Sequence, residues 1–230
     1  MLRLISRYTR WLHTRWPAGT VERLPEARSD GSTNVPGASI SGDLTGIPLL
    51  KFALDSGARA AAAAAEFAAA EKNGPGGEAV LDLVIIGAGV SGMAAAVEAR
   101  KRGLRFEILE ATEPFSTLVN FPRGKPIYTY PRSMKPSGDL QVSADVKEAL
   151  VQELTLQAGR AGIRPMAARV ERVERRGSLV VAHLERGGTF QARRALIAIG
   201  RSGNFRVLGV PGEHLDKVYN RLHEIGRAHV

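Results

Sequence analysis

The feature that most constrains the fold is an apolar run that ends in a glycine-rich turn. Residues 81–86 read Leu-Asp-Leu-Val-Ile-Ile, which is typical of a strand buried on both faces of a parallel sheet. Residues 87–92 then read Gly-Ala-Gly-Val-Ser-Gly, and the pattern predicts a helix over residues 91–102. A second strand is predicted over residues 105–109. This order of strand, turn, helix and strand predicts an α/β fold with a parallel central sheet.

The glycines and a downstream acidic residue fit the pattern of a dinucleotide-binding turn. Gly87 permits the tight turn, Gly89 lets the backbone approach a diphosphate because it has no Cβ, and Gly92 lets helix and strand pack closely. The free N–H groups at the helix N-terminus favour the negative charge of a diphosphate. Glu110 lies 18 residues after Gly92, a spacing that suits a carboxylate accepting hydrogen bonds from a ribose. We therefore expect a bound dinucleotide; the alternative is a glycine-rich turn without a ligand.

The segments before this unit predict a strand, a helix and a linker. Residues 35–41 are expected to form a short strand and residues 48–71 a long helix, because Pro suits a first helical position and the alanine run 60–65 has high helix propensity. Residues 73–77, Asn-Gly-Pro-Gly-Gly, end that helix and read as a linker.

The segments after the unit complete the expected fold. Residues 115–138 are rich in Pro, Gly and aromatic residues and are interpreted as an ordered loop, and residues 144–161 are expected to be helical. Residues 164–191 predict a smaller β layer, and residues 195–199 predict a further strand.

Two more segments, together with the glycine turn, resemble a known family. Residues 195–200 followed by 208–213 are similar to the strand and turn that leave the FAD domain in two-dinucleotide-domain flavoproteins. Residues 33–43, ending in Gly42-Asp43, resemble the second FAD motif of those proteins. The chain from about residue 35 to 213 thus resembles the thioredoxin-reductase-like branch of the pyridine-nucleotide flavoprotein oxidoreductases.

The resemblance implies FAD as the cofactor and assigns contacts to it. Asp43 would accept a hydrogen bond from the ribityl chain, and the helix that follows would point its N-terminus at the flavin pyrimidine edge. Val170 would lend its backbone to the adenine, whereas Thr117 and Asn120 would either touch the cofactor or belong to a surface loop. The residues expected at the cofactor are Gly87, Ala88, Gly89, Val90, Ser91, Gly92, Glu110, Ala111, Gly42, Asp43, Leu49, Leu50, Val170 and Gly200. No catalytic acid, base or nucleophile and no metal site is predicted.

The order of the motifs departs from the family. There the Gly-Asp segment comes last, after an NAD(P)H domain, whereas here Gly42-Asp43 precedes the glycine turn, which predicts a circular permutation. We divide the chain accordingly, into an N-terminal helix with the permuted Gly-Asp segment and its helix (1–72), a linker (73–78), a Rossmann-like FAD-binding domain (79–215), the start of a lost NAD(P)H domain (216–223) and a tail (224–230). The tail, Glu-Ile-Gly-Arg-Ala-His-Val, is what a common sequencing adapter encodes, so we interpret it as adapter read-through on a truncated gene.

The expected function is that of the FAD-binding portion of an NAD(P)H-dependent oxidoreductase. By resemblance, the full-length protein would pass hydride from NAD(P)H to FAD and then electrons to an unknown small-molecule or protein acceptor. The absence of Cys argues against the glutathione-reductase-like branch, whose Cys pair follows the first glycine turn. A flavin-dependent monooxygenase, a non-catalytic dinucleotide-binding module and a basic interaction protein are the alternatives.

Composition excludes some partners and leaves others open. The net charge is +9, but the basic residues are scattered and match no nucleic-acid motif, so no nucleic acid is expected. No apolar run approaches the roughly 20 residues of a membrane span. Residues 1–16 are basic and amphipathic, which predicts a surface helix or a helix lying on a membrane, and their arginines argue against a secretory signal. We expect a cytoplasmic protein, for which a homodimer is one possible assembly.

Overall fold

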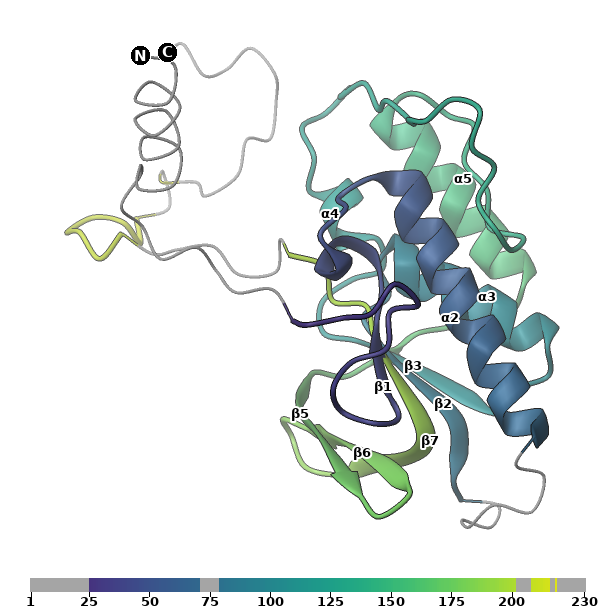
Figure 1. Ribbon diagram of the computed structural model, residues 1–230. Coiled ribbons are helices and arrows are strands. Elements are labelled where there is room, and N and C mark those ends of the chain that lie inside the picture. The colour runs from purple at the N-terminus through teal and green to yellow at the C-terminus, as the bar shows by residue number, and fades with distance from the viewer. Residues whose placement is uncertain (1–24, 71–78, 202–207, 216–217, 219–230) are drawn as a thin grey trace, which may run out of the picture.

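The computed structural model describes residues 25–70, 79–201, 208–215 and 218 (Figure 1). The predicted N-terminal helix over residues 1–16, the linker 73–78 and the tail 224–230 lie outside these described residues. So does the segment 216–223, apart from Val218.

The centre of the fold is a seven-stranded sheet in the order β4-β3-β2-β7-β6-β5, with β1 pairing to β7 as well. Strands β1, β2, β3, β4 and β7 pair in parallel, and β5, β6 and the first part of β7 pair in antiparallel fashion. The strands are β1 (Ala38–Ile40), β2 (Leu81–Ile86), β3 (Phe106–Glu110), β4 (Met166–Ala167), β5 (Val170–Arg176), β6 (Leu179–Leu184) and β7 (Thr189–Ile197). The predicted α/β class, a Rossmann-like fold with a parallel sheet and a smaller β layer, is confirmed.

Three longer helices cover one side of the parallel strands, and the β5–β6 hairpin lies on the other side (Figure 1). The helices are α2 (Leu50–Ala70), α3 (Val90–Lys101), α4 (Ser116–Val119) and α5 (Lys147–Arg160), together with the 3₁₀ helix η1 (Gly42–Thr45). Among the described residues, no helix has the length and apolarity needed to cross a bilayer.

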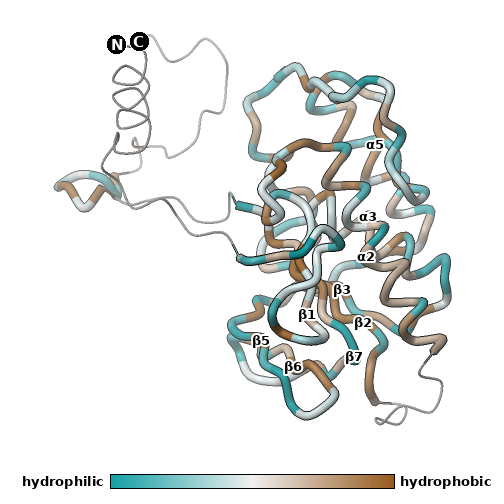
Figure 2. Tube along the Cα trace, in the orientation of Figure 1, coloured by the Kyte–Doolittle hydropathy of each residue, from teal (hydrophilic) through white to brown (hydrophobic). Residues whose placement is uncertain are grey.

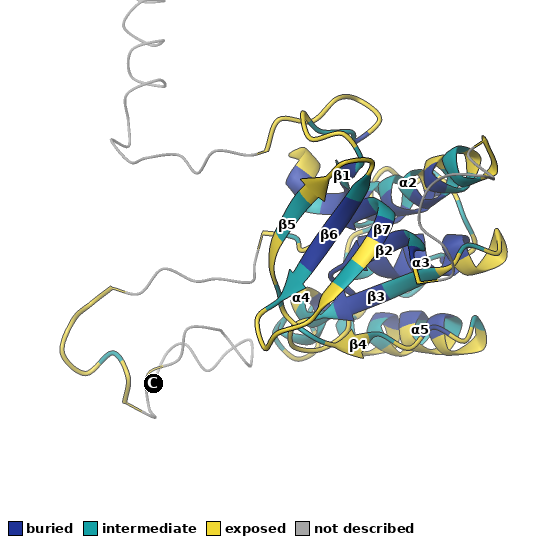
Figure 3. Cartoon of the chain, turned by 90° about the horizontal axis from the view of Figure 1, so that it is seen from below, coloured by how far each residue is buried: buried dark blue, intermediate teal, exposed yellow. Residues whose placement is uncertain are grey.

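The apolar run of β2 is explained by burial on both of its faces. Side chains alternate along a strand, so Leu83 and Ile85 join the core under the helices, while Val84 and Ile86 join a second core under the hairpin. The hydrophobic stretches in Figure 2 accordingly follow the central strands. Figure 3 shows the middle of β6 and much of α3 in the colour of buried residues.

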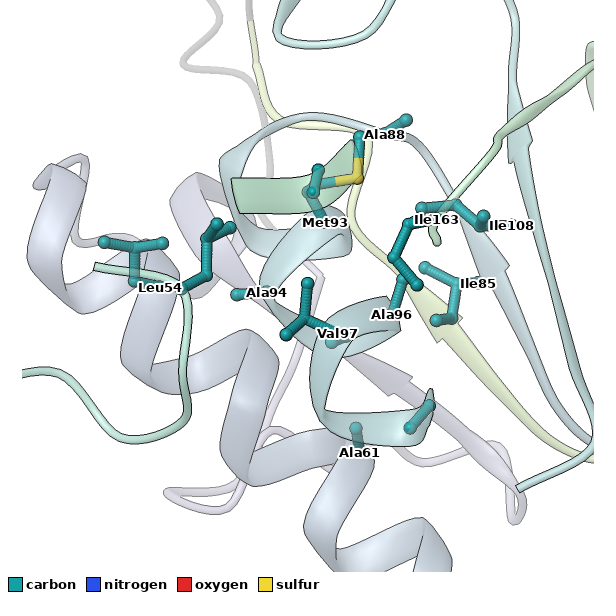
Figure 4. Close-up of a cluster of buried hydrophobic side chains, with 14 of the residues drawn as sticks. Leu54, Ala61, Ile85, Ala88, Met93, Ala94, Ala96, Val97, Ile108 and Ile163 are labelled. Atoms are coloured by element: carbon teal, nitrogen blue, oxygen red, sulfur yellow. The ribbon is translucent and has the colours of Figure 1, made fainter. Parts of the chain in front are cut away.

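Helix α2 packs closely on α3 through small side chains. A Cβ at Gly57 would overlap the carbonyl oxygen of Ser91, so only glycine fits at this crossing. Leu54 and Ala61 of α2 point toward Ala94 and its neighbours on α3 (Figure 4). The alanine-rich sequence of α2 therefore serves a close helix–helix contact.

The observed elements differ from the predicted ones mainly at their ends. The strand predicted over residues 195–199 begins earlier, at Thr189, because the first half of β7 also pairs with β6. Residues 115–138 contain the short helix α4, which the prediction of an uninterrupted loop missed. Helices α2 and α5 begin at Leu50 and Lys147, a few residues after the predicted positions.

Candidate cofactor-binding site

A cavity of about 730 Å³ opens at the carboxyl ends of the parallel strands. Its walls include the residues that directly follow β1, β2, β3 and β7, which the parallel pairing brings to one edge of the sheet. Ligands of open α/β sheets bind outside this edge, and the volume lies in the range of small-molecule and cofactor sites. The fold thus forms a cavity at the edge of the sheet where the sequence analysis predicts a bound dinucleotide.

Two of the three glycines in the turn after β2 are required by the fold itself. Gly87 has φ +100°, and a Cβ there would lie 2.6 Å from the carbonyl oxygen of Ala198. At Gly92 a Cβ would overlap the carbonyl oxygen of Gly87. Gly92 does not line the cavity, so its role is the close packing of α3 on the turn.

Gly89 differs from these two because no steric contact within the described residues requires it to be glycine. Its φ is −68°, which any residue adopts, and a Cβ there would meet no atom of the described chain within 4 Å. Gly89 lies on the cavity wall at the N-cap of α3. Its missing side chain therefore leaves space in the cavity, as the approach of a diphosphate to the backbone requires.

Glu110 holds the turn from the end of the neighbouring strand. Its Oε2 accepts a hydrogen bond of 2.6 Å from the Ala88 amide, and its Oε1 accepts bonds from the amide and hydroxyl of Thr112 at 2.9 and 3.1 Å. A carboxylate offers about four acceptor positions, so capacity remains for a ribose hydroxyl. Ala88 itself is fully buried and does not line the cavity, and its carbonyl oxygen accepts a hydrogen bond of 3.0 Å from the Phe115 amide.

The Gly-Asp segment packs directly against the glycine turn. The buried hydroxyls of Ser41 and Ser91 are hydrogen-bonded at 2.8 Å, and the Gly42 amide donates to Ser56 Oγ at 3.0 Å. Gly42 has φ +69°, and a Cβ there would lie 3.0 Å from that of Ser91. Segments about 50 residues apart in the chain thus form one wall of the cavity.

Asp43 presents a half-buried carboxyl group to the cavity. Burial raises its pKa above the usual range, and the positive charge of Arg201 acts in the opposite direction. Within the described part of the chain its carboxylate accepts no hydrogen bond. A desolvated carboxylate without a protein donor is a good acceptor for a ligand hydroxyl.

Most of the other predicted residues also lie on this cavity. Those lining it are Val90, Ser91, Ala111, Leu49, Leu50, Val170 and Gly200. Thr117 lines it as well, whereas Asn120 does not, because its side-chain amide donates to the carbonyl of Ser116 at 2.7 Å within α4.

The sequence prediction missed several residues of the wall. The aromatic rings of Phe115, Phe121 and Tyr128 and the cations of Lys125, Arg169 and Arg201 line the cavity. With Asp43 and Glu110 as the acidic lining residues, the charged groups leave the wall net positive, which favours a diphosphate. No group of His, Asp or Glu among the described residues is arranged to hold a metal ion.

Comparison with known proteins places this chain in a family. The pattern of the pyridine nucleotide-disulphide oxidoreductases matches residues 81–229. The chain belongs to this family. It matches no curated protein sequence.

Parts of several solved structures are similar to this chain, and the first of those that follow shares its fold. A bacillithiol disulfide reductase from Staphylococcus aureus is 20% identical with a TM-score of 0.51, and the match covers 62% of this chain and 45% of that one. A flavin-containing monooxygenase from Stenotrophomonas maltophilia is 21% identical (TM-score 0.45, covering 52% and 38%). A thioredoxin reductase from Streptococcus pyogenes is 26% identical (TM-score 0.43, covering 59% and 40%). The match spans less than half the length of each of these proteins.

Proposed function

We propose that the chain binds FAD and is the FAD-binding part of an NAD(P)H-dependent flavoprotein oxidoreductase of the thioredoxin-reductase-like branch. Family membership supports an oxidoreductase, and the observation that carries the cofactor is Gly89. Steric contacts in the fold require Gly87 and Gly92, whereas the described chain leaves open space at position 89, where a bound diphosphate would need it.

The residues of the cavity suit the parts of FAD. Gly89 and the N-terminus of α3 would bind the diphosphate through backbone N–H groups and the helix dipole. Glu110 would accept from the adenosine ribose, and Asp43 would accept from the ribityl chain. The start of α2 would place its positive dipole end near the flavin. When bound, FAD would supply the redox chemistry, taking reducing equivalents from NAD(P)H and passing them to an acceptor.

The position of the Gly-Asp segment supports a permuted chain order. Strand β1 precedes β2 in the chain, yet it pairs in parallel with β7, the last strand of the sheet. A segment that followed β7 in the chain could occupy the same place, because pairing and packing do not depend on which end of the chain supplies it. We infer that Gly42 and Asp43 perform here what the family's last motif performs there.

The test is the visible absorption of the purified full chain after addition of FAD and removal of the excess. We expect the two bands of an oxidised flavin, near ~370 and ~450 nm, retained with the protein. A Gly89→Val variant that folds equally well is the matched control and is expected to be colourless. A folded but colourless parent would contradict the proposal, and retention of NAD(H) instead of FAD would assign the cavity to another dinucleotide.

A further inference from the structure

One face of α2 contacts a loop, residues 128–138, that lies about 80 residues further along the chain. Lys51 is 8% exposed, and its Nζ donates hydrogen bonds to the carbonyl oxygens of Pro131, Arg132 and Met134 at 2.9, 3.1 and 2.7 Å. The ammonium group has three N–H donors, so all three are used. Within the described residues it has no carboxylate partner, and its charge is stabilised by these carbonyls alone.

The same face of α2 holds the loop at two further points. Asp55 Oδ1 accepts a hydrogen bond of 2.9 Å from the amide of Ser137. Gly138 has φ +79°, and a Cβ there would lie 2.8 Å from that of Ala58, so the loop passes very close to the helix. Positions 51, 55 and 58 fall on one side of a helix, where successive contacts are three or four residues apart. The contact therefore runs along two turns of α2.

The loop held in this way begins at the cavity. Its two ends are joined where the Ile127 amide donates to the carbonyl of Asp145 at 2.7 Å and the Lys147 amide donates to that of Lys125 at 3.0 Å. Between them, Tyr128 lines the cavity, and its ring stacks on that of Tyr130 at 6.4 Å between centroids. The residue after Tyr130 is the first of the three whose carbonyls bind Lys51.

We propose that Lys51 is a positioning residue of the cofactor site, and this inference rests on the proposed binding of FAD. Its ammonium group fixes the loop to the first turn of α2, so that Tyr128 and the start of α2 form one continuous wall against the cofactor. Without the ammonium group, the three carbonyls lose their donor. Residues 131–134 then lose their attachment to α2, although Ser137 and Gly138 keep theirs, and Tyr128 no longer has a defined place on the wall.

The first measurement concerns the loop alone and needs no cofactor. Hydrogen exchange of residues 128–138 in the full chain is compared between the parent, Lys51→Met and the control Lys101→Met. Lys101 also contacts the loop, through Asp139 at 2.8 Å, but on the surface, where its side chain is 54% exposed. We expect faster exchange of the loop in Lys51→Met and parent-like exchange in Lys101→Met. Unchanged exchange in Lys51→Met would overturn the inference.

The second measurement separates positioning from a general loss of stability. The FAD dissociation constant is determined for the parent, Lys51→Met, Tyr128→Ala and the double variant. Loss of an aromatic contact predicts that Tyr128→Ala weakens binding about three- to tenfold in the parent. In the Lys51→Met background the same change is expected to cost less than about twofold, because the ring is already displaced.

Each outcome has one meaning. Equal factors in the two backgrounds would show that Lys51 does not position Tyr128, whatever its effect on stability. If Lys51→Met does not fold, Lys51→Gln, which keeps two N–H donors, replaces it in the same cycle. If the parent does not bind FAD, the proposed function fails, while hydrogen exchange still decides whether Lys51 holds the loop.

Discussion

The distinction among the three glycines leads to a prediction about single methyl groups. Gly89→Ala should leave the apoprotein intact and weaken FAD binding, whereas Gly92→Ala should destabilise the apoprotein itself. The difference follows from geometry, since an added Cβ at residue 89 meets no atom of the described residues within 4 Å, and one at residue 92 overlaps the carbonyl oxygen of Gly87.

The expected magnitudes can be worked out from these surroundings. At the N-cap, Ala is less favourable than Gly by roughly 0.5–1 kcal/mol, and the reduced entropy of the unfolded chain offsets this by roughly 0.4–1 kcal/mol. Gly89→Ala should therefore change the free energy of unfolding by less than about 1 kcal/mol. Overpacking at Gly92 should cost about 1–3 kcal/mol, which corresponds to a fall in Tm of roughly 2–12 °C for a chain of this size.

Two assays on the same samples test the prediction. Thermal unfolding without FAD gives the stability of each variant, and titration with FAD gives the dissociation constant. We expect Gly89→Ala to weaken binding by at least about tenfold, or about 1.4 kcal/mol, at nearly unchanged Tm. Parent-like affinity in Gly89→Ala would refute the placement of the diphosphate, and a parent-like Tm in Gly92→Ala would refute the packing of α3 on the turn.

Two further predictions concern a titrating group and the core. Burial raises the pKa of Asp43, so the affinity of the parent for FAD should fall as the pH falls through that raised value, because the protonated group is a weaker acceptor. In the apoprotein the same shift acts in the opposite direction: the buried ionised group costs stability as the pH rises through the raised value. Asp43→Asn should bind FAD more weakly at neutral pH and lose this pH dependence, as FAD titrations between pH 4 and pH 8 would show. Leu54→Ala should lower the free energy of unfolding, measured in urea, by about 2–5 kcal/mol, because the side chain of Leu54 on α2 is fully buried in the core with α3. The control Leu156→Ala, at a site 52% exposed, should change it by less than about 0.5 kcal/mol.

Local patterns in the sequence were enough to predict the central unit. The apolar run of β2, the glycine turn and the helix after it are encoded by neighbouring residues, and the structure places all of them within about one residue of their predicted ends. The extent of β7 was not predictable in this way. Its first part is a strand because β6 pairs with it, and that pairing is a property of the folded sheet rather than of residues 189–192 alone.

The residues of the cavity wall could be predicted only in part, again because only some of them belong to local sequence patterns. Glycines and carboxylates at the ends of strands have fixed positions in an α/β fold, so Gly89 and Glu110 could be named from the sequence pattern, whereas Asp43 was named from the resemblance to the family's Gly-Asp motif. Arg201 and Tyr128 reach the cavity from irregular segments, which carry no periodic signal. The buried lysine at position 51 was equally hidden, because its partners are carbonyl oxygens, which every residue type supplies.

The pairing of β1 with β7 leads to a last prediction about the connection between α2 and β2. If strand pairing and packing hold the Gly-Asp segment in place, a continuous chain between α2 and β2 is no longer needed once the protein has folded. Contacts that hold it include the Ala195 amide donating to Gly37 at 2.9 Å, the Ser41 amide donating to Ile197 at 3.1 Å, and the buried face of α2 against α3.

A protease site inserted between Gly76 and Gly77 tests this directly. After cleavage of the folded, FAD-loaded chain, both pieces should elute together in size-exclusion chromatography and keep the flavin absorption. The covalent link only provides an effective concentration of one piece near the other, of millimolar order for short linkers, and the noncovalent contacts remain after the cut. An uncleaved sample of the same variant is the control for the insertion itself. Separation of the pieces with loss of flavin would show that covalent connection holds the segment, and the analogy with a motif supplied from the other end of the chain would fail.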